Sequence, residues 1–563
     1  MMQTYDAIIV GGGHNGLTCA AYLGKAGKKV LVLEARSMIG GLVATHAALP
    51  KAPGFMINRG GSEFIMTQVR PSVVEELGLE QYCFRWVQPP LDPIMSYLTP
   101  SGGSIAFWRD IERTKAEIRR FSPKDAFAYQ RMADALTAFL DVGMPYMMGH
   151  PWRISPKTAM RVAAGLARGR GQVATGARII LSSIDSVLEE WFESDELRTA
   201  MATYSLANFG PPSESASGFS MAVIPGFHRW GVRRPVGGSM EFPKALAACI
   251  EAHGGEIRTS TRVRTILSDG GRAYGVQLES GEEIRARSVA AAVDPHTLVT
   301  KLMAPEDVPE TLAGQIRGLR VNRFDLYTFK LDVALDRPPV FPRFADRDRD
   351  VLSVVTLCPS LESLRASMQA ALTGTWSEDP PLICLMHSVQ DRSLVPPGSN
   401  GDTLYFYLTS VASQLSGGRD WLTEKHRFAQ AILDHFEQYA PGTQDSIIDM
   451  LATSPPEFES EFNVYKGSYN HADPILSQMG PTRPVPALRG WRTPVDGLWH
   501  TGAGAFPFGW ISGWPGRGTA REILRVDKRH RRPAMPPATV EPAPSGPPQS
   551  VDVPSASTHA PVA

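Results

Sequence analysis

Three glycines near the start of the chain have the spacing of a dinucleotide-binding turn. Gly11, Gly13 and Gly16 follow the apolar run 7–10 and precede residues 17–26, which favour a helix. In this context the first glycine permits a tight turn, the second lets a pyrophosphate approach the backbone, and the third lets the helix pack on the strands. Amides at the helix start would then face the phosphates. The pattern predicts a nucleotide site.

A carboxylate ends the next apolar run. Glu34 follows residues 30–33 and stands 18 positions after Gly16. A carboxylate at this point can accept hydrogen bonds from the ribose hydroxyls of an adenosine. It would repel a 2′-phosphate, so the site disfavours NADP and leaves NAD and FAD as candidates.

A short loop after this carboxylate separates FAD from NAD. It contains Arg36, Gly40 and Gly41. In flavoproteins a loop of this kind wraps the pyrophosphate and the ribityl chain, whereas a plain surface loop is the alternative interpretation. The loop favours FAD as the cofactor.

A second glycine-rich turn lies near the far end of the chain. Gly502 and Gly504 follow the strand-like run 498–500. Ser512 and Gly513 then precede a run compatible with a helix. A helix start aimed at the flavin ring would stabilise negative charge on the reduced cofactor. We therefore expect loops from both ends of the chain to hold one extended FAD molecule.

Composition narrows the class of protein. The 563 residues include 57 Lys and Arg against 57 Asp and Glu, and 43% are hydrophobic. This balance gives no basic surface for nucleic acid and enough apolar material for a large core. No apolar run approaches the roughly 18 residues that span a bilayer. The five cysteines form no CxxC pair, which argues against a disulfide scaffold or a metal site and predicts a reducing compartment, the cytoplasm.

The elements that must position these residues predict an α/β protein. We expect a Rossmann-like FAD-binding domain, a mixed or antiparallel-sheet substrate domain interwoven with it, and a helical insertion within residues 121–191. A helix is expected at 240–252, and residues 257–267 and 273–278 look like strands, with 288–293 returning to the first sheet. Residues 324–335 and 403–411 alternate apolar and polar side chains or favour strands, which is typical of an antiparallel sheet, and 424–439 has the pattern of an amphipathic helix.

These elements give discontinuous domains. The expected FAD-binding domain comprises 1–90, 237–300 and 490–527, and the expected substrate domain comprises 91–236 and 301–489. Residues 528–563 begin basic and become rich in proline, a composition that predicts a disordered tail.

Several short motifs occur together along the chain. They are Ile9-Val10-Gly11-Gly12-Gly13-His14-Asn15-Gly16-Leu17, Glu34 with Gly40-Gly41, Trp191-Phe192, Gly237-Gly238-Ser239, Thr261-Arg262-Val263, Thr501-Gly502-Ala503-Gly504 and Ile511-Ser512-Gly513. With them the chain resembles, from about residue 5 to 524, the phytoene-desaturase-like flavoproteins, a branch of the amine-oxidase-type FAD superfamily. Within that group its sequence is most similar to the flavin-type β-carotene ketolases and to the branch called pyridine nucleotide-disulfide oxidoreductase domain-containing protein 2.

The resemblance implies particular FAD contacts. They are Gly13, Gly16, Glu34, Arg36 and Gly41, then Gly61 and Ser62 near the ring, the backbone of Val263 at the adenine, and Gly504 and Gly513 at the ring and the ribityl chain. One segment departs from the family: where relatives have Thr-His-Pro-Gly-Gly beside the flavin, this chain has Ala505-Phe506-Pro507-Phe508-Gly509-Trp510. These aromatic residues should reshape the mouth of the substrate site.

The expected chemistry is the oxidation of a lipophilic small molecule, with carotenoids and other polyenes as candidates. A flavin takes a hydride while the protein supplies orientation and access, so the sequence need not show a charged catalytic triad. Desaturation and oxygenation both fit. We identify no catalytic residue: Glu63, His228 and His500 are candidate proton carriers, and His14 is expected to cap the phosphate turn.

Two other functions remain open. One is an amine-oxidase-like activity, which usually needs an aromatic pair around the flavin. The other is a flavin-bound protein that acts through partners, with the basic segment 525–532 and the proline-rich tail as a tether. Cations among apolar residues at 157–178 suggest either a solvated helix face or contact with an anionic membrane. The sequence gives no further indication of protein partners.

Overall fold

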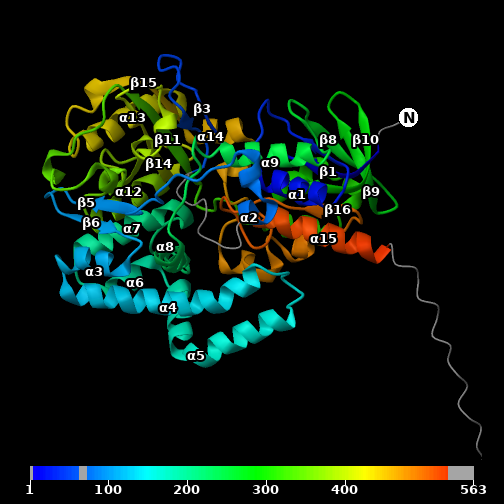
Figure 1. Cartoon of the computed structure of the whole chain (residues 1–563), viewed down its shortest axis with the longest axis horizontal. Helices are drawn as coiled ribbons and strands as arrows, with labels where there is room; N and C mark the ends of the chain where they lie inside the picture. The colour runs from blue at the N-terminus through cyan, green and yellow to red at the C-terminus, as the bar shows by residue number, and fades with distance from the viewer. Residues whose placement is uncertain (1–3, 62–72, 531–563) are drawn as a thin grey trace, which may run out of the picture.

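The computed structural model describes residues 4–61 and 73–530, which form two sheets with helices packed around them (Figure 1). The expected α/β class is confirmed, because one sheet has a parallel core and the other is largely antiparallel. Ser62, Glu63 and residues 531–563 of the expected tail lie outside the described residues. The expected start of that tail was wrong, because residues 528–530 belong to the last helix.

The first sheet carries the glycine turn. Its order is β7-β2-β1-β10-β9-β8, and β16 pairs with the end of β10. Strands β7, β2, β1, β10 and β16 run parallel to their neighbours, while β9 and β8 add an antiparallel hairpin. The strands are β1 (Thr4–Val10), β2 (Val30–Leu33), β7 (Glu256–Arg258), β8 (Val263–Asp269), β9 (Arg272–Leu278), β10 (Glu283–Ala291) and β16 (Leu498–His500).

One strand prediction for this sheet was wrong. The run 257–267 is divided between β7 and β8, which lie at opposite edges of the sheet. Between them Ser260 takes a left-handed backbone conformation, with φ of 50°. The amide of Ser260 donates to the carbonyl of Arg36 and that of Thr261 to the carbonyl of Glu34, each at 2.8 Å. The chain thus crosses the end of β2 instead of continuing as one strand.

Helices cover the first sheet. Helix α1 packs against α9 and α15, and a Cβ added at Gly516 would lie 2.0 Å from the carbonyl oxygen of Asn15. The helices of this part are α1 (His14–Lys25), α2 (Val73–Leu77), α9 (Glu241–Ala252), α10 (Pro295–Thr297), α11 (Glu310–Arg317) and α15 (Trp514–His530). The basic segment that begins at Arg525 therefore continues α15 as far as His530, and Arg525 pairs with Glu522 of the same helix.

The second sheet is buried on both faces. Its order is β15-β11-β14-β13-β12-β5-β6, antiparallel except between β12 and β5. Along β14, Tyr405 and Tyr407 face a cluster formed with helices, whereas Phe406 and Leu408 face the other core. The strands are β5 (Met95–Leu98), β6 (Ser104–Phe107), β11 (Leu326–Leu335), β12 (Val354–Leu357), β13 (Leu382–Leu385), β14 (Asp402–Ala412) and β15 (Ile447–Thr453).

The alternation seen in the sequence of β11 does not mark a solvent face. All ten residues of this strand are buried, Lys330 and Asp332 included. Both faces are covered, so the polar positions of the pattern lie inside the protein.

Helices on the two faces complete this part. The expected helical insertion is seen: α4 and α5 form a hairpin at the lower edge of Figure 1. The helices are α3 (Ile111–Arg119), α4 (Pro123–Met147), α5 (Pro156–Leu181), α6 (Ile184–Trp191), α7 (Asp195–Phe209), α8 (Ile224–Trp230), α12 (Leu361–Leu372), α13 (Trp421–Glu437) and α14 (Pro455–Phe462). A small sheet of β3 (Thr45–His46) and β4 (Ile57–Asn58) packs against β11 and β14 of the second sheet.

Among the described residues, none of the helices has the length and apolar character needed to cross a membrane.

Candidate functional site

A groove of about 1100 Å³ lies at the carboxyl ends of β1 and β2. It joins the turn at Gly11 with the turn at Gly502, although the two stand at opposite ends of the chain. Ligands of open α/β sheets bind outside the carboxyl ends of the strands. The other lining segments come from 33–36, 40–42, 261–263, 292–294, 462–464 and Tyr469 with His471.

The first glycine turn is built as the sequence predicts. Gly11 has φ of 105°, and an added Cβ would lie 2.8 Å from the carbonyl oxygen of Ala292. A Cβ at Gly16 would lie 2.2 Å from the carbonyl oxygen of Gly11, so this glycine holds α1 close to the strand. A Cβ at Gly13 would meet no atom within 4 Å. Gly13 therefore leaves space in the groove, while the other two glycines permit the tight backbone.

The start of α1 is free to bind an anion. Its N-cap is Gly13, which provides no side-chain hydrogen bond, and the first turn contains no acidic residue. Unsatisfied amides and the helix dipole make such an end attractive to phosphate. His14 does not cap the turn as expected; its Nε2 donates to the carbonyl of Trp510 at 3.1 Å and so fastens the turn to the far end of the chain.

Glu34 is held rigidly at the edge of the groove. Its Oε2 accepts from the amide of Gly12 at 2.7 Å, and its Oε1 accepts from the amide of Arg36 at 2.8 Å. The residue is 8% exposed and lines the groove. Because each carboxylate oxygen can accept more than one hydrogen bond, both keep capacity for ribose hydroxyls.

The loop after Glu34 packs against the glycine turn. Gly40 has φ of 106° and its amide donates to the carbonyl of Gly12 at 2.8 Å. A Cβ at Gly41 would lie 3.2 Å from Cα of Gly13. Arg36 donates from Nη1 to the carbonyl of Gly41 at 3.2 Å and lies over the ring of Phe462. The predicted residues Arg36, Gly40 and Gly41 thus form one wall of the groove.

The remaining predicted residues fall into two groups. Val263 and Gly502 line the groove. Gly504 lies against Pro295, where an added Cβ would be 2.9 Å from the proline ring, and Gly513 lies against Thr18 of α1. These two glycines and Ser512, whose Oγ accepts from the amide of Trp514 at the start of α15, are not among the residues that line the groove.

Gly61 does not line the groove but is fixed by hydrogen bonds to neighbouring segments. Its amide donates to the carbonyl of Leu42 at 2.7 Å, and its carbonyl accepts from Asn58 at 2.7 Å. These bonds fix the chain directly before the undescribed segment that contains Ser62.

Sequence reasoning missed three polar side chains near the groove. Asn15 Oδ1, Thr501 Oγ1 and His471 Nδ1 are buried without a hydrogen-bond partner among the described residues. Buried polar atoms are normally paired, so unpaired ones call for a ligand. Asn15 and His471 line the groove and Thr501 precedes Gly502. A dinucleotide, with its many hydroxyl, phosphate and carbonyl groups, fits this set of atoms.

His471 also has an unusual backbone. Its φ of 59° lies in the left-handed region, which a residue with a side chain occupies at a cost. No feature of the sequence could have revealed this conformation.

Two histidines, His14 in the groove lining and His500 in β16, are held neutral. Burial lowers the pKa of His14 to about 4. Burial, with a smaller contribution from the charge of His471, lowers the pKa of His500 to about 4. At neutral pH neither ring adds a positive charge near the cofactor position.

The candidate proton carriers are not gathered in the groove. His228 lies on α8, where Nε2 contacts the hydroxyl of Tyr129 at 2.9 Å and Nδ1 donates to the carbonyl of Arg109. His500 is fully buried in β16. Neither lines the groove, and Glu63 lies outside the described residues.

Aromatic side chains form a wall next to the groove. Phe508 packs edge-on against Trp510 at 4.5 Å between ring centres and against Phe219 at 5.7 Å. Phe506 packs against Tyr146 of α4 and against Trp491. The segment that departs from the family pattern therefore connects the far-end glycine turn to the helical insertion.

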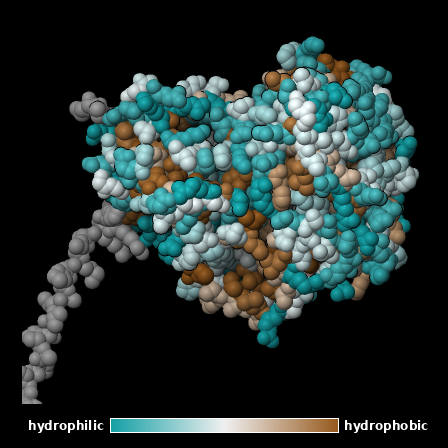
Figure 2. Space-filling model, turned by 180° about the vertical axis from the view of Figure 1, so that it is seen from behind, coloured by the Kyte–Doolittle hydropathy of each residue, from teal (hydrophilic) through white to brown (hydrophobic). Residues whose placement is uncertain are grey.

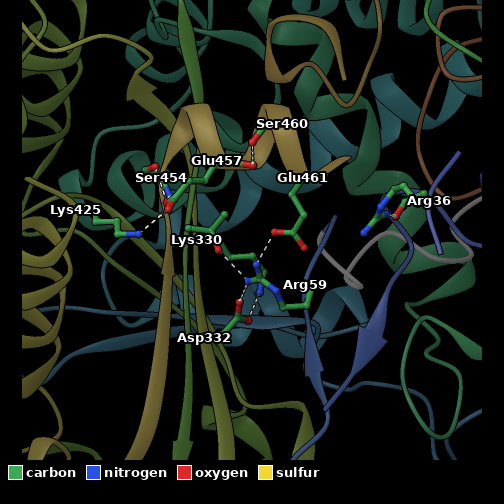
Figure 3. A network of polar contacts seen from close by, with 11 residues as sticks. Arg36, Arg59, Lys330, Asp332, Lys425, Ser454, Glu457, Ser460 and Glu461 are labelled. Atoms are coloured by element: carbon green, nitrogen blue, oxygen red, sulfur yellow. Dashed lines mark hydrogen bonds and ion pairs between the residues drawn. The ribbon is translucent and has the colours of Figure 1, made fainter. Parts of the chain in front are cut away.

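A buried ion network joins the segment before Gly61 to the second sheet (Figure 3). Arg59 donates to Asp332 Oδ2 at 3.0 Å, to Thr453 Oγ1 at 2.9 Å and to Glu461 Oε2 at 2.6 Å. Lys330 pairs with the other oxygen of Asp332, and neither side chain is exposed. Arg59 thus connects the segment before Gly61 to β11, β15 and α14.

Comparison with known proteins identifies relatives over nearly the whole chain. Residues 16–472 match the family described as flavin containing amine oxidoreductase. Pyridine nucleotide-disulfide oxidoreductase domain-containing protein 2 of Rattus norvegicus is 28% identical over 92% of this chain and 93% of its own length. Phytoene desaturase (lycopene-forming) of Pantoea ananas is 26% identical over 92% of this chain and 98% of its own. A solved structure of putrescine oxidase bound to putrescine has a TM-score of 0.58 at 16% identity, over 94% of this chain and all of that one.

Proposed function

Since the chain belongs to the flavin containing amine oxidoreductase family and is thereby an FAD-dependent oxidoreductase, we propose that it oxidises a lipophilic small molecule by desaturation or oxygenation. Carotenoids and other polyenes are the candidate substrates. The observation that carries the proposal is the single groove that joins the turns at Gly13 and Gly502. FAD bound there would supply the acceptor for a hydride.

The chain's own residues would hold the cofactor along its length. Amides at the start of α1 would bind the pyrophosphate beside the open space at Gly13. Glu34 would accept from the ribose, and Val263 would lie at the adenine. Asn15 Oδ1 and His471 Nδ1, which lack protein partners among the described residues, would receive their hydrogen bonds from the cofactor or from water that it orders.

The aromatic wall supports a lipophilic substrate. Phe506 and Phe508 are buried and stand directly after the turn at Gly502 and Gly504. Their rings would exclude water from the mouth of the site and offer apolar contact. Neutral His14 and His500 add no charge that would favour an ionic substrate. We propose no catalytic acid or base among the described residues.

Anaerobic reduction of the bound flavin tests this proposal. The purified full chain is mixed with a solubilised polyene or with a primary amine, and the visible flavin absorbance is followed. Desaturation passes a hydride from the substrate to the flavin without oxygen, so for this reaction we expect the polyene to bleach the flavin and the amine to leave it oxidised. Oxygenation would leave the flavin oxidised with both compounds, because it needs O₂ and a separate electron donor. Bleaching by the amine alone, with release of hydrogen peroxide once oxygen is admitted, would replace the proposal by an amine-oxidase activity.

The variant Phe508→Ala sharpens the test. Removal of the ring opens the mouth while the cofactor loops stay intact, so the apparent KM for the polyene should rise with the FAD content unchanged. Leu422→Ala, a change at a side chain of α13 that is 75% exposed, is the control and should alter neither quantity. Equal KM values for Phe508→Ala and the wild type would show that the aromatic wall does not contact the substrate.

A further inference from the structure

The outer face of α5 is not covered by any element within residues 4–61 and 73–530. In Figure 1 α5 lies at the edge of the molecule with α4 above it. Glycines seat the two helices closely: a Cβ at Gly176 would lie 2.4 Å from the carbonyl oxygen of Ala135, and one at Gly165 would lie 2.9 Å from Val142. None of residues 156–175 is buried. One face of α5 contacts α4, and the opposite face meets solvent.

Large apolar side chains project from this edge. Trp152 and Ile154 precede α5 and are 51% and 55% exposed, and Met160 on the helix is 65% exposed. Leu166, six residues further on, is 39% exposed. Figure 2 shows apolar side chains gathered at the lower end of the molecule, where the α4–α5 hairpin lies. Single exposed apolar residues are ordinary, but a group of them indicates a contact surface.

The same edge is strongly basic, although the whole chain is neutral. Residues 142–184 contain six Lys and Arg and no Asp or Glu. Two of these cations, Arg153 and Arg178, pair with Glu522 and Glu190. The other four are exposed and form no ion pair with any residue from 4 to 61 or from 73 to 530: Lys157, Arg161, Arg168 and Arg170.

We propose that the outer face of α5, with the segment 152–155 before it, docks on a bilayer surface that contains anionic lipids. Helices that lie in the membrane interface combine apolar side chains at the acyl boundary with Lys and Arg among the headgroups. Each cation near an anionic leaflet strengthens binding by about fivefold. The proposal goes beyond the oxidation chemistry and does not depend on FAD or on any substrate.

Charge and polarity favour a lipid surface over two other possible partners, a second copy of the chain and a nucleic acid. A second copy of the chain placed on this face would bring two unpaired sets of cations together, which is unfavourable. A nucleic acid would satisfy the cations but leave Met160 and Leu166 against phosphate. A lipid surface accommodates both kinds of side chain.

Vesicle flotation tests the proposal on the full-length chain with its cofactor. Vesicles are phosphatidylcholine alone, or phosphatidylcholine with about a third phosphatidylglycerol. We expect binding to the anionic vesicles, a decrease with added salt, and little binding to the neutral ones. The triple variant R161Q/R168Q/R170Q should bind roughly a hundredfold more weakly, from about fivefold per charge.

Two further variants keep the result interpretable. R264Q/R285Q/R287Q removes three exposed cations from β8 and β10 of the first sheet, gives the same net charge, and should bind as the wild type does. M160S/L166S keeps every cation and should also weaken binding. Circular dichroism and flavin absorbance confirm that each variant is folded.

Several outcomes would overturn the proposal. They are no binding to anionic vesicles, equal binding to both kinds of vesicle, or equal losses in the two charge variants. Displacement of the vesicles by a DNA duplex would favour a nucleic acid, and a change of sedimentation coefficient in M160S/L166S would favour self-association. A failure here leaves the flavin reduction experiment unaffected, because that experiment contains no vesicles.

Discussion

Gly13 and Gly16 are the same residue type in one turn, yet the structure gives them different tasks. A methyl group at Gly13 would point into open space, whereas one at Gly16 would lie 2.2 Å from a backbone oxygen. Gly13→Ala should therefore fold with an unchanged melting temperature without FAD and bind FAD more weakly by about 1–3 kcal/mol, roughly 5- to 150-fold. Gly16→Ala should melt lower even without FAD. Thermal unfolding with and without FAD checks both, and a Gly13→Ala protein with wild-type affinity would contradict the assignment.

Glu34 gives a second prediction at the residue scale. Glu34→Gln replaces one carboxylate oxygen by an NH₂ group and removes the charge, so an ionic acceptor for the ribose hydroxyls of FAD is lost. The expected loss is about 2 kcal/mol, or roughly thirtyfold in the dissociation constant of FAD. Glu283→Gln, an exposed position on β10, is the matched control. Quenching of FAD fluorescence measures both, and equal affinities would rule out a binding role for Glu34.

His500 connects stability to pH. Burial lowers its pKa from 6.5 to about 4 in the folded protein, so between these values the unfolded chain binds the proton and the folded chain does not. Stability is therefore complete above about pH 6.5 and is lost as the pH falls toward 4, by about 2 kcal/mol at pH 5 from this residue alone.

The variant His500→Gln should reduce this pH dependence. Urea unfolding at pH 7 and pH 5 should show a smaller difference in free energy of unfolding than in the wild type. The comparison is within each protein, so a uniform loss of stability in the variant does not affect it. An identical pH difference in the two proteins would show that His500 is protonated equally in both states.

The residues that the sequence did not reveal share a cause. His471, Asn15 and Thr501 matter because burial leaves their polar atoms without partners, and burial depends on segments far away in the chain. The glycines and Glu34 were predictable because their roles follow from local turn geometry and from a fixed spacing to a strand and a helix.

At the scale of elements, Arg59 shows how the segment after β4 is fastened to the second sheet. It reaches Asp332 on β11, Thr453 on β15 and Glu461 on α14 from one position after β4. The variant Arg59→Met should lower the free energy of unfolding by about 3 kcal/mol, because a buried carboxylate loses a partner. Arg337→Met, which removes an exposed pair with Asp336, should cost no more than about 0.5 kcal/mol. Equal unfolding midpoints in urea would contradict this role.

Periodicity predicted most elements but not their partners. The first strand, turn and helix, the long helices of the insertion and α13 all lie where the patterns placed them. The run 257–267 failed because its two halves pair with different strands, and the pairing depends on the loop after Glu34. The burial of Lys330 and Asp332 could not be predicted from the alternation, because Arg59, the partner of Asp332, stands about 270 positions earlier in the chain.

At the scale of the whole molecule, the groove exists only because both ends of the chain meet. β16 pairs with β10, and β10 pairs with β1, so the turn at Gly502 is placed beside the turn at Gly11. α15 then packs on α1. The domain boundaries expected from the sequence stay a prediction, as does the disorder of the tail, whose residues from 531 lie outside the described part.

Titration of the flavin-free chain with FAD, FMN and ADP tests the central claim most directly. The claim is that loops from both ends of the chain hold one extended dinucleotide. It predicts one FAD per chain, far weaker binding of FMN, which lacks the adenosine that Glu34 and Val263 would contact, and competition between ADP and FAD. Binding of FMN as tight as that of FAD, with no effect of ADP, would contradict it.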